Sequence, residues 1–253
     1  MIDLSLLQDF LVEAGEHLAE MESDLLQLET DPERQRAFLA TVATYFGLVG
    51  LFFWLALSLY ANEIIMLLTR RPEFWVGAKI IPIAAFTSVL EGYGSFLGIG
   101  MVMTNRSHFI TMSIVISAAA NLALNFVLVP PLGMVGAALS TLLAYLLWDG
   151  LKLYFSWKFY DIRVEGGRLC HLAAATAALY GASFLLPSSA SIWTLLGAKG
   201  LLLCSYPVVI YRTGFFRTDE KKKIWKLYRE FRAAGPAETL RRAGRFLRGG
   251  GAA

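Results

Sequence analysis

The sequence predicts an all-α membrane protein: a bundle of six transmembrane helices with an N-terminal amphipathic helix and a basic C-terminal tail. Two observations favour this class. Of the 253 residues, 56% are hydrophobic and 17% are charged, which leaves too little charge for the surface of a soluble domain. The apolar residues also form long blocks. Residues 37–60 and 109–132 contain no Asp, Glu, Lys, Arg or His, and each block can cross about 30 Å of hydrocarbon as a helix.

Residues 1–33 differ from the rest of the chain in charge, with ten Asp and Glu residues and no Lys or Arg. Apolar residues recur in steps of three and four from Leu4 to Leu28, which predicts an acidic cytoplasmic helix with one apolar face. We expect this helix to end at Asp31, because a proline disfavours helical geometry at the residue before it.

Six apolar blocks within residues 37–211 predict the transmembrane bundle. They cover residues 37–60, about 78–101, 109–132, 134 to about 157, about 169–186 and 191–211. Residues 62–75, between the first two blocks, are amphipathic and are expected to lie in the membrane interface.

The distribution of basic residues predicts the orientation, since Lys and Arg concentrate in cytoplasmic loops. One side of the bundle carries most of the bases, whereas the other carries only Arg70, Arg71 and Lys79. An even number of spans then places both termini in the cytoplasm. Residues 212–253, with twelve bases and four acids, form a basic tail that either rests on anionic membrane lipids as an amphipathic helix or stays solvated.

The sequence contains no pattern typical of an enzyme. His17, His108 and His171 occupy three unrelated contexts, and no phosphate-binding glycine loop is present. We therefore expect no catalytic residue, no metal site and no cofactor. The basic residues lie where membrane topology requires them, so we expect no nucleic-acid partner.

Polar residues within the apolar blocks are the candidate functional residues, because such groups are costly in a bilayer. For the asparagines, the alternative is interhelical hydrogen bonding, and for the Asp–Lys pair of the fourth block it is an ion pair near the headgroups. Glu91 and Lys199 either face a polar lumen or pair with each other. The candidates are Glu91, Asn121, Asn125, Asp149, Lys152 and Lys199.

The most specific pattern is the stretch from Asn121 to Thr141, which predicts a tight helix hairpin. Its prolines, Pro130 and Pro131, are expected to end one span. Small residues then allow the next helix to pack closely. They are Gly133, Gly136, Ala137 and Ser140.

This stretch resembles the signature of Wzx-type polysaccharide (O-antigen) flippases, which belong to the multidrug/oligosaccharidyl-lipid/polysaccharide exporter superfamily. The resemblance covers about residues 36–220, the C-terminal half of such a transporter. It implies a non-enzymatic flippase for an undecaprenyl-diphosphate-linked oligosaccharide in the bacterial inner membrane, acting in lipopolysaccharide biosynthesis. By this resemblance, Lys199 contacts the anionic headgroup, Glu91 couples transport to a proton or ion, and Asn121 and Asn125 join the substrate site.

Residues 1–33 resemble the first helix of the histidine phosphotransfer domain of chemotaxis-type kinases. The phosphoacceptor pattern of that domain is absent, and His17 lies in the wrong helix to be the phosphorylated residue. Three readings stay open. The chain is a half-length flippase that pairs with a second copy or with a separate N-terminal half, a membrane-anchored module that recruits a signalling partner through residues 1–33, or an inert truncated fusion.

Overall fold

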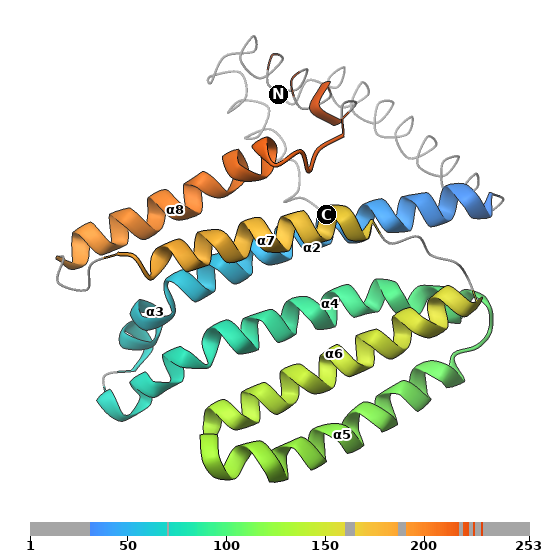
Figure 1. Ribbon diagram of the computed structural model, residues 1–253, viewed down its shortest axis with the longest axis horizontal. Helices are drawn as coiled ribbons and strands as arrows, with labels where there is room; N and C mark the ends of the chain where they lie inside the picture. Colours follow the sequence, from blue (N-terminus) through green and yellow to red (C-terminus); the bar gives the residue numbers. More distant parts are fainter. Residues whose placement is uncertain are drawn as a thin grey trace, which may run out of the picture. The chain divides into compact units, whose positions relative to one another are not determined.

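The computed structural model describes residues 31–69, 71–159, 165–186, 191–217, 220–222, 225 and 229, and within them every regular element is a helix. The chain divides into two compact units, residues 1–203 and 204–253. The elements are α2 (Pro32–Leu59), α3 (Ala61–Leu68), the 3-10 helix η1 (Pro72–Lys79), α4 (Ile81–Met103), α5 (His108–Leu132), α6 (Met134–Phe159), α7 (Gly166–Ser183) and α8 (Ile192–Arg212) (Figure 1).

The N-terminus of α2 is fixed by Asp31, whose backbone is extended with φ −115° and ψ 97°. Its carboxylate accepts hydrogen bonds from the backbone N–H groups of Glu33 and Arg34, at 3.0 and 3.2 Å. Such a cap stabilises a helix by about 1 kcal/mol. The predicted break at Asp31–Pro32 is therefore the start of α2. The acidic helix predicted before it, with His17, lies outside the described residues, as does most of the basic tail.

The protein is a helical membrane protein. Four helices, α2, α5, α6 and α8, are long and apolar enough to span a bilayer, and η1 with α4, bent by 45°, makes a fifth candidate. The described residues thus give four or five candidate spans where the sequence predicted six. The difference is α7, which has 18 residues, many of them alanine, and carries Arg168 and His171 in its first turns.

Within residues 31–203, the helices of the first unit form a row. The extensive contacts join α7 to α2, α2 to α4, α4 to α6 and α6 to α5, and η1 packs on α3 and α4 (Figure 1). Small residues and aromatic side chains make the contacts between neighbouring helices of the row. Gly50 contacts Val89, and Trp54 donates a hydrogen bond from Nε1 to the Pro82 carbonyl at 2.8 Å. Helix α4 therefore lies in the row between α2 and α6.

The α5–α6 hairpin turns at Gly133 and not at the prolines. Pro130 and Pro131 lie within the last turn of α5, so the expectation that they end the span is wrong. Gly133 has φ +57°, a conformation that favours glycine, and its N–H donates to the Val129 carbonyl at 2.8 Å. No neighbouring atom lies within 4 Å of where its Cβ would be. Gly133 therefore makes the turn and does not mediate helix packing.

Candidate functional site in the α4–α6 contact

Asp149 and Lys152 form an ion pair buried between α4 and α6. The distance from Lys152 Nζ to Asp149 Oδ1 is 2.9 Å; Lys152 is 3% exposed and Asp149 is 7% exposed. The Lys152 ammonium also lies 3.6 Å from the centre of the Trp148 ring, a favourable cation–π distance. The sequence suggested an interfacial pair near the headgroups. In the structure the pair is enclosed by the helices of the row, and Gly94 of α4 lies directly against it.

Gly94 of α4 makes the room that this ion pair occupies. A Cβ at this position would collide with the Asp149 carboxylate and lie 2.5 Å from Lys152 Nζ. Gly94 is near the middle of α4, so the charges contact the central part of a membrane helix. A larger residue would force the two side chains to move, so glycine at this position of α4 provides the space for the buried pair on α6.

Glu91 extends this group of charges toward the surface of the row. Glu91 is close enough to Tyr145 and Asp149 to interact with both electrostatically, and the Tyr145 and Trp148 rings lie edge to face with centroids 5.5 Å apart. Glu91 itself is exposed. We call Glu91, Tyr145, Trp148, Asp149 and Lys152 the α4–α6 charge cluster.

The interior of the charge cluster has unused hydrogen-bonding capacity. The Tyr93 hydroxyl and Trp148 Nε1 are buried and make no hydrogen bond to the described residues, and the Asp149 oxygens have only their ion pair with Lys152. Buried polar groups normally have partners. The arrangement can therefore bind a proton or one small polar group in a region of low dielectric.

Lys199 of α8 is paired with Glu63 of α3 and not with Glu91. Its Nζ lies 2.5 Å from Glu63 Oε1, and beside the pair the Tyr60 hydroxyl donates to the Leu196 carbonyl at 3.2 Å. The suggested pairing of Lys199 with Glu91 is therefore wrong. Sequence reasoning missed Glu63 because it lies in the amphipathic segment that was expected to lie in the membrane interface, outside the apolar blocks that were searched for polar residues.

Asn121 and Asn125 lie in the α5–α6 contact and not in the charge cluster. Asn125 donates from Nδ2 to Asn121 Oδ1 at 3.0 Å, and the Ser140 hydroxyl of α6 donates to Asn125 Oδ1 at 2.6 Å. Ser140 is fully buried. The pair is thus engaged in interhelical hydrogen bonding, the alternative that the sequence had left open.

Close approach of the two backbones accompanies these hydrogen bonds. A Cβ on Gly136 would collide with the Leu128 carbonyl of α5, so this position tolerates only glycine without a shift of the helices. The Ala137 carbonyl accepts a hydrogen bond from Thr141 Oγ1 at 3.0 Å. The stretch that resembles the flippase signature therefore builds a close helix–helix contact.

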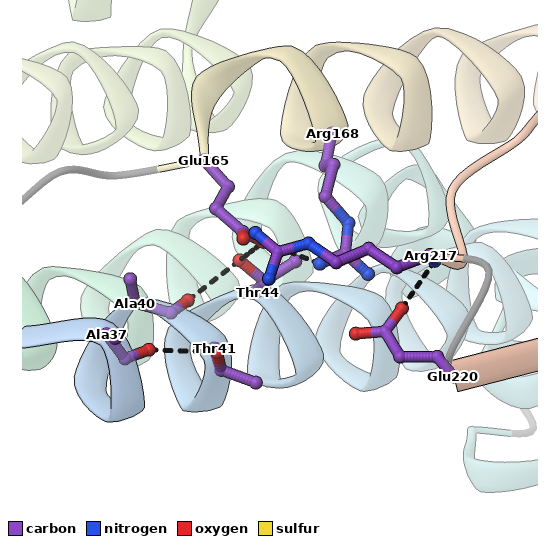
Figure 2. A network of polar contacts seen from close by, with 8 residues as sticks. All are labelled: Ala37, Ala40, Thr41, Thr44, Glu165, Arg168, Arg217 and Glu220. Carbon is purple, nitrogen blue, oxygen red and sulfur yellow. Dashed lines mark hydrogen bonds and ion pairs between the residues drawn. The ribbon is translucent and has the colours of Figure 1, made fainter. Parts of the chain in front are cut away.

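A third polar group joins the start of α7 to α2. Thr44 Oγ1 lies 3.2 Å from Glu165 Oε2, and Arg168 Nη1 forms an ion pair with the same oxygen at 2.6 Å (Figure 2). Thr44 is almost fully buried. Glu165 and Arg168 hold α7 against α2, and sequence reasoning did not identify this contact because Thr44 lies 121 residues before Glu165. In the C-terminal unit, the backbone N–H of Arg217 donates a hydrogen bond to Glu220 Oε2 at 2.7 Å.

Comparison with models of known protein families, with characterised proteins and with solved structures found no match to this chain. Among the described residues, no group of three or more His, Cys, Asp and Glu side chains is placed to hold a metal ion. The function is therefore inferred from the residues and their geometry.

Proposed function

We propose that this chain is one lobe of a membrane transporter that moves a lipid-linked oligosaccharide across the bilayer without catalysing a reaction. The observation that carries the proposal is the Asp149–Lys152 pair, buried between two membrane helices in space made by Gly94. Ionisable residues are rare in membrane spans and mark transport pathways and proton relays. An inert anchor has no need of them.

The substrate class follows from the resemblance to polysaccharide flippases. Residues 121–141, which carry that resemblance, fold into the α5–α6 hairpin next to the charge cluster. An undecaprenyl-diphosphate-glycan combines a diphosphate with sugar hydroxyls, and Lys, Tyr and Glu side chains can bind both groups. In this proposal, Lys199 binds the diphosphate by exchanging the Glu63 carboxylate for a phosphate oxygen.

The transporter works with a second lobe, either a second copy of this chain or a separate N-terminal half. Within the first unit, α7, α2, α4, α6 and α5 form a row, and only 11% of the most apolar part of α5 is buried. A closed translocation pathway needs walls on both sides, and a single row supplies one. Membrane lipids and the second lobe cover the remaining surfaces.

In this proposal the chain crosses the bacterial inner membrane six times, with α7 as the fifth crossing and both termini in the cytoplasm. Reporter fusions test this arrangement. Alkaline phosphatase, active only outside the cytoplasm, should be inactive when fused after residue 253 and active when fused between α7 and α8. Phosphatase activity at the C-terminus would contradict the orientation.

Complementation tests the activity. In a bacterial strain that lacks its lipid-linked oligosaccharide flippase, we expect surface polysaccharide to return when this chain is expressed with an N-terminal lobe. Asp149→Asn and Lys152→Gln should abolish the return. Lys158→Gln, which removes an exposed cation from the same helix, is the matched control and should have no effect. Absence of polysaccharide with every second lobe, from a chain that is inserted in the membrane, would refute the proposal.

A further inference from the structure

One face of α4 is exposed and differs in chemistry from the other exposed faces of the row. It consists of Ala84, Ser88, Glu91 and Ser95, all exposed and spaced three or four residues apart. We call these four residues the α4 face. Both serine hydroxyls donate to the carbonyl four residues earlier in the helix, Ser88 to Ala84 and Ser95 to Glu91, each at 3.3 Å. The face is therefore small and smooth, with one carboxylate at its centre.

The other exposed faces of the row carry large apolar side chains. On α2, Val49 and Phe53 are 53% and 59% exposed, and on α5, Phe126 and Val127 are 76% and 67% exposed. Such side chains suit contact with lipid chains. Small polar residues and a carboxylate do not, because each would meet hydrocarbon. The α4 face is therefore not a surface for lipid.

The same chain shows which surface such residues make when they are covered. In the α5–α6 contact, Ser113 and Ser117 of α5 are buried together with Gly136 and Ser140 of α6. The Ser113 hydroxyl likewise donates to the carbonyl four residues earlier, at 2.7 Å. Small residues of this kind allow membrane helices to approach closely. Since its serine hydroxyls are already bonded within the helix, the α4 face suits another helix better than a chain of sugar hydroxyls.

Charge indicates what this other helix carries. Glu91 and Asp149 are two carboxylates in one cluster, and Lys152 is its one ammonium group. Of the other lysines in the described spans, Lys199 is paired with Glu63, Lys158 lies in the last turn of α6 and Lys79 lies in the last turn of η1. One negative charge of the cluster is thus uncompensated by the described spans, and an unpaired charge in a bilayer is strongly unfavourable.

We propose that the α4 face binds a transmembrane helix of a different polypeptide, with a Lys or Arg side chain opposite Glu91. This rests on the proposed function, because the second lobe of the transporter supplies that helix. A second copy of this chain fits less well, since Lys152 and Lys199 already pair within their own chain and Lys79 and Lys158 lie at the ends of their helices, away from the level of Glu91.

Site-specific crosslinking in native membranes tests the proposal with the full chain. A photoreactive phenylalanine analogue replaces Ser88 or Ser95, and the controls carry it at Phe53 and Phe126, on the lipid-facing surfaces. We expect one protein adduct from Ser88 and Ser95 and none from the controls. Mass spectrometry should assign the adduct to a transmembrane peptide of another protein that contains Lys or Arg.

Substitution of Glu91 then tests the charge. Glu91→Gln should reduce the adduct several-fold and Glu91→Lys should abolish it, while the amount of chain inserted in the membrane stays constant. Crosslinking to a second copy, to a peptide without a base, or with equal yield in Glu91→Lys would overturn the proposal. So would rapid labelling of Ser95→Cys by a membrane-impermeant maleimide, which would show that the face lines a water-filled lumen, and so would the absence of any adduct.

The outcome is separable from that of the proposed function. Restored surface polysaccharide without an adduct at Ser88 and Ser95 would reject the docking surface and retain the transporter. An adduct that depends on Glu91, in cells with no restored polysaccharide, would retain the surface and reject flippase activity.

Discussion

Helix α6 makes two contacts of opposite character. Toward α5 it presents Gly136 and Ser140, and the contact is neutral, close and hydrogen-bonded through Asn125. Toward α4 it presents Asp149 and Lys152, and the contact is charged and fits around Gly94. Small residues enable both contacts, but for different purposes. At the first, glycine brings two backbones together, and at the second it makes space for charges. The first contact is typical of helix packing that stabilises a fold, and the second is typical of a functional site.

The largest expected effect is the loss of one charge from the α4–α6 contact. Lys152→Met leaves Asp149 buried without its cation, and we expect the free energy of unfolding to fall by about 3–5 kcal/mol. The double variant Asp149→Leu/Lys152→Met, which removes both charges, should be close to the parent in stability. Unfolding in mixed detergent micelles measures both. Equal losses of unfolding free energy in the single and double variants would contradict the prediction that an unpaired buried charge causes the loss.

The next largest effect is expected at the neutral contact. Gly136→Ala places a methyl group against the Leu128 backbone carbonyl, which cannot move without shifting α5, so we expect a loss of about 1–3 kcal/mol. Gly150→Ala, on the same helix with no neighbouring atom within 4 Å of the new Cβ, is the control and should change stability little. The same unfolding assay compares them. A smaller loss at Gly136 than at Gly150 would show that the helices are not in close contact.

Gly94→Ala should have a smaller effect on stability than Gly136→Ala. Its new methyl group meets the ends of the Asp149 and Lys152 side chains, which can rotate away, so we expect the lower part of the overpacking range, about 1 kcal/mol. Gly98→Ala, whose methyl group would make an ordinary 3.7 Å contact with Ile110, is the control. Trp148 fluorescence offers a second readout, because displacement of Lys152 changes the surroundings of that ring. An unchanged spectrum would argue against displacement.

The smallest effect is expected from Ser140→Ala. It removes the hydrogen bond to Asn125, and interhelical hydrogen bonds in membranes contribute about 0.6 kcal/mol on average. The same unfolding assay measures the difference, with Thr141→Val as a control that removes a hydroxyl bonded only within α6. A loss as large as that of Lys152→Met would remove the distinction between the two contacts.

The hairpin could be predicted from the sequence because its two helices are consecutive in the chain and are separated by a single residue, Gly133. The predicted spans of residues 109–132 and 134–157 correspond to α5 (His108–Leu132) and α6 (Met134–Phe159). The turn at Gly133 was misplaced because the prolines are a stronger local signal than one glycine, although a proline pair is tolerated in a last turn.

The charged contact could not be predicted, because its environment comes from a distant part of the chain. Asp149 was identified as a candidate, but its burial depends on Gly94, more than fifty residues earlier. In the same way, Lys199 was identified without its partner Glu63, which lies 136 residues away. A residue pattern gives the type of group inside a span, whereas its partner is set by the packing of helices that are remote in sequence.

The cap at the start of α2 has a mechanical consequence. The carbonyl of Asp31 accepts the first helical hydrogen bond of α2, from the Gln35 N–H at 3.0 Å, but the backbone of Asp31 itself is extended, so helical geometry begins only at Pro32. A continuous helix through this position would carry a rotation of the preceding residues directly into the first span, whereas an extended residue interrupts that path.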